Sequence, residues 1–230
     1  MGFFAMQNSK KKLALDLKKF PNLDKFSKNL EKFPKNLDSF SKDKFLFVKT
    51  LVENPIELGQ VTPSSRFLAE GMVASLDLAN AKAVVEFGPG TGAITKAIVK
   101  KCGDKTKFFA VETNANMIEI WQRRFPEHQI IQDSAENIGE LLKRNGLEHA
   151  DYIISSLPFA LIEPKLGQRI LNNSYASLRP GGVFVTYQYV HARVINSVMR
   201  LLRKTFPVVD TSVVFRNLPP SFVFRCQKPE

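Results

Sequence analysis

The sequence predicts an α/β fold built on a mostly parallel sheet with an antiparallel C-terminal edge. From residue 81 onward, short apolar segments alternate with helical segments, and this order is typical of a doubly wound parallel sheet. A glycine-rich turn, Gly88-Pro89-Gly90-Thr91-Gly92, joins the first strand-like segment to the first helical one. Near the C-terminus, two strand-like segments follow each other without a helix between them, which indicates an antiparallel edge.

Seven segments have the composition of strands. They are short, rich in Val, Ile and Phe, and bounded by residues that favour turns. Those that are almost continuously apolar suit parallel strands buried on both faces. In chain order, the expected strands are residues 81–88, 105–112, 128–133, 150–158, 182–190, 208–217 and 221–227.

Five longer segments between these strands have the spacing of amphipathic helices. Their apolar residues recur every three or four positions, as one face of an α-helix requires. The expected helices are residues 94–101, 115–125, 137–146, 166–178 and 192–206. After the fourth helix, Arg179-Pro180-Gly181-Gly182 predicts a turn that leads into the fifth strand.

The positive charge of the chain is concentrated at its N-terminus. The 230 residues carry a net charge of +11. Residues 1–49 hold 12 Lys, no Arg and five acidic residues, a net charge of +7. We therefore expect two units, a basic segment over residues 1–49 and a larger α/β domain over residues 50–230. A polyanionic partner is expected at the first, and nucleic acid and an anionic membrane surface both qualify.

Apolar residues in the basic segment are spaced like one face of a helix. Pro21 and Pro34 interrupt the pattern, which predicts two or three short amphipathic helices in series. A solvated tail, or a helix that packs on the domain, would also fit. A basic helix with a Phe and Leu face is typical of an interfacial membrane helix, and contact with RNA phosphates alone would not need that face. The apolar positions are Leu13, Leu17, Phe20, Leu23, Phe26, Leu30, Phe33, Leu37, Phe40 and Phe47.

Cysteine usage and hydropathy bound the expected location of the protein. Cys102 and Cys226 form no metal-binding or disulfide pattern, so a reducing cytosol is the default and no metal site is expected. No apolar run approaches the roughly 18–20 residues that span a bilayer. We expect a cytoplasmic protein bound peripherally to the inner face of the cell membrane, with no obligate protein partner.

The segment Glu86-Phe87-Gly88-Pro89-Gly90-Thr91-Gly92 has the form E-x-G-x-G-x-G between a strand and a helix. It resembles motif I of the class I methyltransferases, which have a Rossmann-like sheet. In that family the motif cradles the amino acid part of S-adenosylmethionine. The resemblance implies that Glu86, Gly88, Gly90, Thr91 and Gly92 bind this cofactor, with S-adenosylhomocysteine as product. A tight turn in another Rossmann-like protein is the alternative interpretation.

Polar residues at the ends of the next strands follow the order of the same family. Glu112 ends the second strand, where an acid can accept hydrogen bonds from both ribose hydroxyls. Asp133 ends the third strand, and the family uses this Asp, followed here by Ser134, near the adenine amino group. Ser155, at the end of the fourth strand, is also expected at the cofactor. The segment Leu178–Gly182 resembles the L-x-P-G-G turn of the superfamily, whose role is structural.

The segment Ser155-Ser156-Leu157-Pro158-Phe159 departs from the motif of amino-methylating relatives, N/D-P-P-Y or N-L-P-Y, because Ser replaces Asn and Phe replaces Tyr. It resembles the S-G-L-P segment of the bacterial phospholipid N-methyltransferases. Thr62-Pro63-Ser64-Ser65-Arg66 and Arg216-Asn217-Leu218-Pro219-Pro220 are similar to two further segments of that family. The resemblance covers about residues 45–228 and implies methylation of phosphatidylethanolamine towards phosphatidylcholine.

The chemistry of that reaction suggests roles for further residues. The amine of phosphatidylethanolamine must lose a proton before each methyl transfer, since it is an ammonium at neutral pH. Tyr187, Tyr189, His191 and the backbone carbonyls from Ser155 to Leu157 are candidates to hold it, and a Tyr face also attracts a methylated ammonium. For the rest of the lipid, the expected substrate-binding residues are Ser64, Ser65, Arg66, Phe159 and Arg216.

Other functions remain open from sequence alone. An RNA adenine N-methyltransferase is favoured by the basic segment and opposed by the Ser and Phe after the fourth strand, and we expect no nucleic-acid partner. A small-molecule methyltransferase and a non-catalytic lipid-binding protein on the same scaffold are further alternatives. The intact motif I and Glu112 argue against the last.

If residues 1–49 bind anionic vesicles through their Phe and Leu face, replacing Phe20, Phe26, Phe33 and Phe40 with Ser should abolish co-sedimentation even at low salt. Raising salt should weaken binding of the unaltered chain without abolishing it, because only the Lys contribution, about 1 kcal/mol for each residue, is screened. A four-Ser variant that still co-sediments would show that this segment is a tail or a packing helix.

Overall fold

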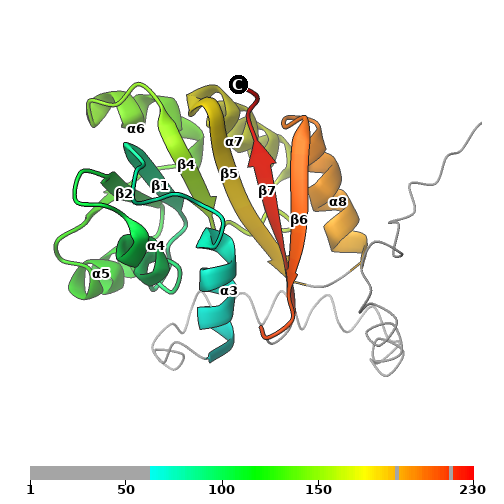
Figure 1. Cartoon of the computed structure of the whole chain (residues 1–230), viewed down its shortest axis with the longest axis horizontal. Helices are drawn as coiled ribbons and strands as arrows, with labels where there is room; N and C mark the ends of the chain where they lie inside the picture. Colours follow the sequence, from blue (N-terminus) through cyan, green and yellow to red (C-terminus); the bar gives the residue numbers. More distant parts are fainter. Residues whose placement is uncertain (1–62, 190–191, 218–219) are drawn as a thin grey trace, which may run out of the picture. The chain divides into compact units, whose positions relative to one another are not determined.

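The computed structural model describes residues 63–189, 192–217 and 220–230, and the expected helices of the basic segment lie outside them. The described chain forms a seven-stranded sheet in the order β3-β2-β1-β4-β5-β7-β6 (Figure 1). The strands are β1 (Ala83–Phe87), β2 (Lys107–Glu112), β3 (Gln129–Gln132), β4 (Ala150–Ser155), β5 (Leu178–Tyr189), β6 (Val208–Val214) and β7 (Ser221–Gln227).

The pairing of the strands confirms the predicted fold class. The pairs β1–β2, β2–β3, β1–β4 and β4–β5 are parallel, whereas β7 runs antiparallel to both β5 and β6. The helices are α3 (Pro63–Val73), α4 (Thr95–Lys101), α5 (Ala115–Arg124), α6 (Ile138–Arg144), α7 (Pro164–Ser177) and α8 (Ala192–Arg203), and a short 3-10 helix, η2 (Ala135–Asn137), precedes α6. The result is a Rossmann-like sheet with an antiparallel edge.

Two apolar clusters cover the two faces of the sheet. In β1, Val85 and Phe87 belong to the cluster that contains α6, α7 and α8, whereas Val84 belongs to the cluster that contains α3 and α4. This alternation follows from the two-residue period of a strand. Both faces of the central strands are therefore buried, as the continuously apolar segments predicted.

Local sequence sets where several helices begin. The side chain of Asn114 accepts hydrogen bonds from the backbone N–H groups of Asn116 and Met117 at the start of α5. The carboxylate of Glu163 does the same for the first turn of α7, where Pro164 occupies the first helical position. These caps fix where the loops after β2 and β4 end.

Two elements differ from the sequence prediction. The helix α3 was not among the expected helices; Pro63 occupies its first position, where proline suits a helix start. The turn expected at residues 179–182 lies within β5, which begins at Leu178. Leu178 pairs with Ala150, the register then shifts, and Gly181 has a φ of 70°. The turn residues thus form an irregularity inside a strand.

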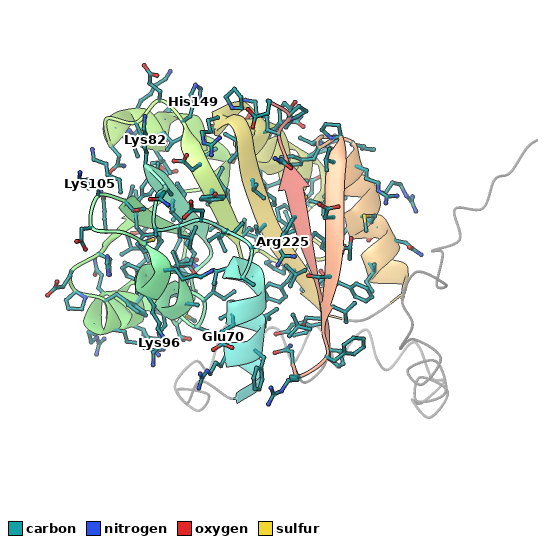
Figure 2. The ribbon with its side chains drawn as sticks, in the orientation of Figure 1. Glu70, Lys82, Lys96, Lys105, His149 and Arg225 are labelled. Carbon is teal, nitrogen blue, oxygen red and sulfur yellow. The ribbon has the colours of Figure 1, made fainter. Side chains whose placement is uncertain are left out.

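Arg225 on β7 fastens α3 to the sheet. Its guanidinium donates one hydrogen bond to the carbonyl of Gly71, at 2.5 Å, and another to the hydroxyl of Ser212, at 2.9 Å. Figure 2 labels this side chain on the face that α3 covers. None of the helices in the described ranges is long and apolar enough to cross a membrane.

Asp151 ties together the amino-terminal ends of three strands. Its Oδ2 accepts hydrogen bonds from the backbone N–H groups of Lys82 and Ala83, both at 2.9 Å, and its Oδ1 accepts one from Arg179 at 2.5 Å. The carboxylate is buried, so water does not readily replace it at the two backbone N–H groups, whereas the Arg179 guanidinium is partly exposed. Asp151 therefore sets the position of β1 relative to β4 and β5.

Replacing Asp151 with Ala should lower the free energy of unfolding by about 3 kcal/mol, because it leaves two backbone N–H groups and a guanidinium without their acceptor. Chemical denaturation measures this. The matched control is Asp104→Ala, an exposed position where the change should stay within about 0.5 kcal/mol. Equal effects of the two substitutions would contradict the role of Asp151.

Candidate active site

The parallel strands end at one edge of the sheet, which we call the carboxyl edge. β1, β2, β3 and β4 end there at Phe87, Glu112, Gln132 and Ser155. In Figure 2, Glu70 and Lys96 lie on the side of this edge, and Lys82 and His149, which precede β1 and β4, lie at the opposite edge. The order of the strands across the sheet changes direction between β1 and β4. Ligands of open α/β sheets bind at the carboxyl edge beside such a reversal.

The glycine-rich turn after β1 has a backbone that only glycine adopts readily. The φ angles of Gly88, Gly90 and Gly92 are 63°, 52° and 85°. A Cβ at Gly92 would lie 2.2 Å from the Phe125 ring, so this glycine allows α5 to pack closely. A Cβ at Gly90 would meet no atom of the described residues within 4 Å. The backbone at Gly90 therefore faces open space, where a ligand can approach it.

Thr91, in the same turn, is held from the side of α5. Its carbonyl accepts a hydrogen bond of 2.5 Å from the guanidinium of Arg124. Gly92 also donates from its backbone N–H to the carbonyl of Pro89, at 2.8 Å. These contacts fix the shape of the turn without using the side chain of Thr91.

Glu86 places a carboxyl group directly beneath this turn. The side chain is fully buried, and its Oε2 accepts a hydrogen bond of 2.6 Å from the hydroxyl of Thr95. Its Oε1 has no hydrogen-bond partner among the described residues. Burial raises the pKa of Glu86 to about 8; the hydrogen bonds from Thr95 lower the pKa and the charge of Glu112 raises it. A buried oxygen without a partner suits a cationic ligand.

Glu112 stands at the end of β2, beside β1. Its Oε1 accepts hydrogen bonds from the backbone N–H groups of Thr113, at 2.8 Å, and Asn114, at 3.1 Å. These bonds orient the carboxylate, and the half-buried position leaves it accessible to a ligand. Its second oxygen can accept from hydroxyl groups, as expected for a ribose contact.

Asp133 and Ser134 organise the loop after β3. The Oδ1 of Asp133 accepts hydrogen bonds from the backbone N–H of Ser134 and from the side chain of Asn137, both at 2.7 Å. These bonds, the Asn137 bond first, lower the pKa of Asp133. The hydroxyl of Ser134 accepts from the backbone N–H of Glu136 and begins η2. Both residues thus lie at the carboxyl edge, with Asp133 ionised at neutral pH.

The segment after β4 folds back over the end of β1. Ser156 donates from its backbone N–H to the carbonyl of Phe87, at 2.9 Å, and the buried hydroxyl of Ser155 accepts from the N–H of Leu157, at 3.2 Å. The carbonyl of Leu157 accepts a hydrogen bond from the N–H of Phe159. The ring of Phe159 is buried against Phe184, with centroids 6.1 Å apart, whereas we expected it to contact the substrate.

Two tyrosines lie at the end of β5, on the face that α3 covers. The rings of Tyr187 and Tyr189 meet edge to face, with centroids 5.5 Å apart. Burial raises the pKa of both phenols. Both are therefore neutral at physiological pH, which suits them to hydrogen bonding and to contact with a cation rather than to proton removal as phenolates.

Arg66 and Arg216, far apart in sequence, both lie at α3. The guanidinium of Arg216 lies 3.9 Å from the ring centroid of Phe67, and Arg66 pairs with Glu70 at 2.9 Å on the exposed side of the helix. Ser64 and Ser65 belong to the first turn of α3, and His191 lies outside the described residues. The structure thus brings the two arginine-containing segments together.

Sequence reasoning missed Thr95, Trp121 and Thr186 as site residues. Trp121 donates from its indole N–H to the hydroxyl of Thr95, at 2.8 Å, and so completes the surroundings of Glu86. Thr186 pairs with Ser155 across β4 and β5, and its buried hydroxyl has no hydrogen-bond partner among the described residues. Only the folded sheet brings these residues to the site, so no local pattern could have indicated them.

Residues 84–182 match a family model described as a methyltransferase domain. The chain carries a class I S-adenosylmethionine-dependent methyltransferase domain. The matched range includes the glycine-rich turn, Glu112, Asp133 and Ser155. S-adenosylmethionine is the methyl donor and S-adenosylhomocysteine the product.

Relatives of the methyltransferase act on different acceptors. An ornithine lipid N-methyltransferase of Singulisphaera acidiphila is 26% identical over 191 residues, which cover 80% of this chain and 96% of that protein. An rRNA adenine N-6-methyltransferase of Bacillus licheniformis is 26% identical over 129 residues, 56% of this chain and 42% of the relative. The chain thus spans less than half of the rRNA enzyme.

Solved structures confirm the fold. The N-methyltransferase NodS from Bradyrhizobium japonicum superposes with a TM-score of 0.60 at 16% identity, over 74% of this chain and 98% of that one. TrmN from Thermus thermophilus gives a TM-score of 0.55 at 19% identity, over 72% of this chain and 53% of that one. At these identities the likeness concerns the fold alone.

The residues at the carboxyl edge fit S-adenosylmethionine. The Oε1 of Glu86, which has no partner among the described residues, suits its ammonium group. The open space beside the half-buried Gly90 allows close approach, and the oriented carboxylate of Glu112 suits a ribose. Glu86 and Gly90 would hold the amino acid part of the cofactor, and Glu112 would hold its nucleoside part. The cofactor residues expected from sequence therefore gather at one edge.

Replacing Glu112 with Ala should weaken S-adenosylmethionine binding at least tenfold, about 1.4 kcal/mol, because the hydroxyl acceptor is lost. Isothermal titration calorimetry measures this. Glu119→Ala, an exposed position on α5, is the matched control and should bind normally. Unchanged affinity of Glu112→Ala, with normal folding, would remove Glu112 from the site.

Proposed function

We propose that the protein transfers methyl groups from S-adenosylmethionine to the amine of phosphatidylethanolamine at a membrane surface, towards phosphatidylcholine. The observation that carries this proposal is the similarity to a lipid N-methyltransferase over 96% of that relative's length. The segment Ser155–Pro158 at the end of β4 supports it, since this segment resembles the S-G-L-P segment of the phospholipid N-methyltransferases. An ornithine lipid is the alternative lipid acceptor, because that is the substrate named for the relative.

The acceptor half of the carboxyl edge, which is formed by the ends of β4 and β5 and by α3, suits an amine that bears an anionic group. Tyr187 and Tyr189 are neutral and offer ring faces and hydroxyls, which can hold an amine and favour its methylated, cationic forms by about 0.5–2 kcal/mol. Arg216, stacked on Phe67, is held with its guanidinium near the start of α3. A planar guanidinium suits a phosphate oxygen pair, as in a phospholipid head group.

Methyl transfer depends mainly on the alignment of the amine with the methyl group. When bound, S-adenosylmethionine supplies an electrophilic methyl group on a sulfonium. The chain must hold the neutral amine in line with that group, and positioning of this kind contributes much of the rate. The hydroxyls of Ser155 and Thr186 and the carbonyl of Leu157 lie at the ends of β4 and β5, where they can accept hydrogen bonds from the amine.

Raised pKa values exclude the two tyrosines as the immediate proton acceptors at neutral pH. A phenol whose pKa is raised stays protonated: its hydroxyl can donate or accept a hydrogen bond, but it is not a phenolate that could take up a proton. We infer that the ammonium proton leaves to water before methyl transfer, while the neutral amine is held by oxygen acceptors. His191 remains a prediction outside the described residues.

Apolar side chains on two loops suit contact with a lipid surface. Leu161, after β4, is 54% exposed and Phe215, after β6, is 50% exposed. β4 ends at the carboxyl edge. The turn between β6 and β7 follows Val214, and Val214 pairs with Ser221, which in turn pairs with the last residue of β5. The basic amphipathic segment of residues 1–49 would add a second contact. We therefore propose peripheral binding to the inner face of the cell membrane.

RNA adenine methylation is the second candidate. It is favoured by the rRNA adenine methyltransferases among the relatives and by the net charge of +11. It is disfavoured because the aromatic residue after β4 is Phe159, whose ring is buried against Phe184 and so is not placed to stack on a base.

Incubation with methyl-labelled S-adenosylmethionine should separate these acceptors. Vesicles of phosphatidylethanolamine with an anionic lipid should become labelled, and total RNA should not. Vesicles that carry an ornithine lipid in place of phosphatidylethanolamine form a third arm, and labelling there alone would assign the other lipid. Labelled adenine in RNA, with unlabelled lipids, would overturn the proposal.

The acceptor site is tested in the same assay by a pair of variants. Tyr189→Ala should slow lipid methylation about tenfold with normal S-adenosylmethionine affinity, since the ring is lost. Tyr189→Phe keeps the ring and should retain most of the rate for methylated intermediates. Equal loss of cofactor binding and methylation in Tyr189→Ala would mean that the ring supports the fold.

A further inference from the structure

A chain of hydrogen bonds links three elements beneath the glycine-rich turn. The indole N–H of Trp121 on α5 donates to the hydroxyl of Thr95 at 2.8 Å, and that hydroxyl donates to the Oε2 of Glu86 at 2.6 Å. All three side chains are buried. Thr95 is the first residue of α4, so the chain joins α5 and α4 to the end of β1. Methyl transfer itself does not require these hydrogen bonds.

The direction of these bonds is fixed by the chemistry of the groups. An indole nitrogen only donates, so the Thr95 hydroxyl must accept from Trp121 and turn its own proton towards Glu86. The Oε2 of Glu86 is therefore an acceptor in both protonation states. The Oε1, which has no partner among the described residues, is the atom that carries the proton when Glu86 is neutral.

We propose that Trp121 and Thr95 are positioning residues that make Oε1 of Glu86 the titrating atom and direct it to the ammonium group of S-adenosylmethionine, so that cofactor binding displaces a proton from Glu86. The proton leaves Oε1 for solvent, and the carboxylate that remains pairs with the cofactor ammonium. This inference rests on the cofactor and is independent of whether the acceptor is lipid or RNA.

The surroundings of Glu86 favour a neutral carboxyl group before the cofactor binds. α4 and α5 present the uncharged Thr95 and Trp121, and the guanidinium of Arg124 on α5 bonds to a carbonyl of the glycine-rich turn instead. The charged group that acts on Glu86 is Glu112 on β2, which is also an acid. With the pKa raised to about 8, mainly by burial, Glu86 is protonated at neutral pH in the unbound protein.

The sign of the pH dependence follows from this. Below about pH 8 the unbound protein carries the proton that binding must displace, so affinity for S-adenosylmethionine rises as pH rises. Between about pH 6 and 7.5, the affinity for S-adenosylmethionine should rise nearly tenfold for each pH unit. A site with a permanently ionised carboxylate would show no such slope in this range.

The unbound protein offers a test without cofactor, because Trp121 is the one tryptophan of the sequence and is joined to Glu86 through Thr95. Titration of its fluorescence should show a transition near pH 8 that is absent in Glu86→Gln. Glu119→Gln, exposed on the same helix as Trp121, is the matched control and should keep the transition. A flat wild-type titration, or a transition retained in Glu86→Gln, would overturn the proposal.

Binding calorimetry tests the displaced proton directly. At pH 6.5, S-adenosylmethionine titrations in buffers of different ionisation enthalpy should report about one proton released per cofactor bound, and none in Glu86→Gln. Release that persists in Glu86→Gln would assign the proton to another group.

The positioning role has its own variants. Thr95→Val keeps the shape but removes the hydroxyl, and Trp121→Phe removes the indole donor; each should weaken binding about tenfold. Thr95→Val should also move the fluorescence transition to higher pH, because the lost hydrogen bond had lowered the pKa, whereas Thr95→Ser should restore both. Unfolding midpoints identify any variant that is merely unstable. Stable Thr95→Val and Trp121→Phe proteins with wild-type affinity and pH dependence would overturn the role.

Discussion

A buried carboxyl group at the end of β1 is the constraint on which the site depends. Glu86 ionises less readily in the folded chain than in the unfolded one, since burial raises its pKa from 4.5 to about 8. Between those values the folded state holds a proton that the unfolded state releases, so this group lowers stability as pH rises from about 4.5 to 8. A strongly shifted pKa of this kind is typical of functional sites.

The same carboxyl group explains the arrangement of its neighbours. Thr95 must begin α4 within hydrogen-bond distance, and Trp121 must reach it from α5. Gly92 allows that approach, because any larger residue would overlap the Phe125 ring. The glycine-rich turn is therefore both a ligand-facing loop and the joint between β1 and two helices.

The carboxyl edge divides into two halves with different chemistry. The ends of β1, β2 and β3 present carboxylates and bare backbone, which suit a cationic nucleoside cofactor. The ends of β4 and β5, together with α3, present hydroxyls, neutral phenols and an arginine stacked on an aromatic ring. Methyl transfer needs both halves at one edge, because the acceptor atom and the methyl group must meet in line.

Sequence patterns predicted those parts of the site that depend on local order. Glu86 near the end of β1, the glycine-rich turn that follows it and Glu112 at the end of β2 could be identified because strand, turn and helix follow each other directly. Thr95 and Trp121 could not, since only α4 and α5 packing on β1 brings them to Glu86. The ring of Phe159 looked like a substrate contact by motif, but the segment after β4 turns it into the core. The helix α3 was missed because Pro and Ser favour turns as well as helix starts.

A crystal structure with bound S-adenosylhomocysteine tests the central claim most directly, because it shows whether the carboxyl edge holds the cofactor through Glu86 and Glu112. We predict the homocysteine amine at hydrogen-bond distance, about 2.7–3.2 Å, from the Oε1 of Glu86, and the ribose hydroxyls at Glu112. A ligand bound away from β1 and β2, with the Oε1 of Glu86 still lacking a partner, would contradict the account.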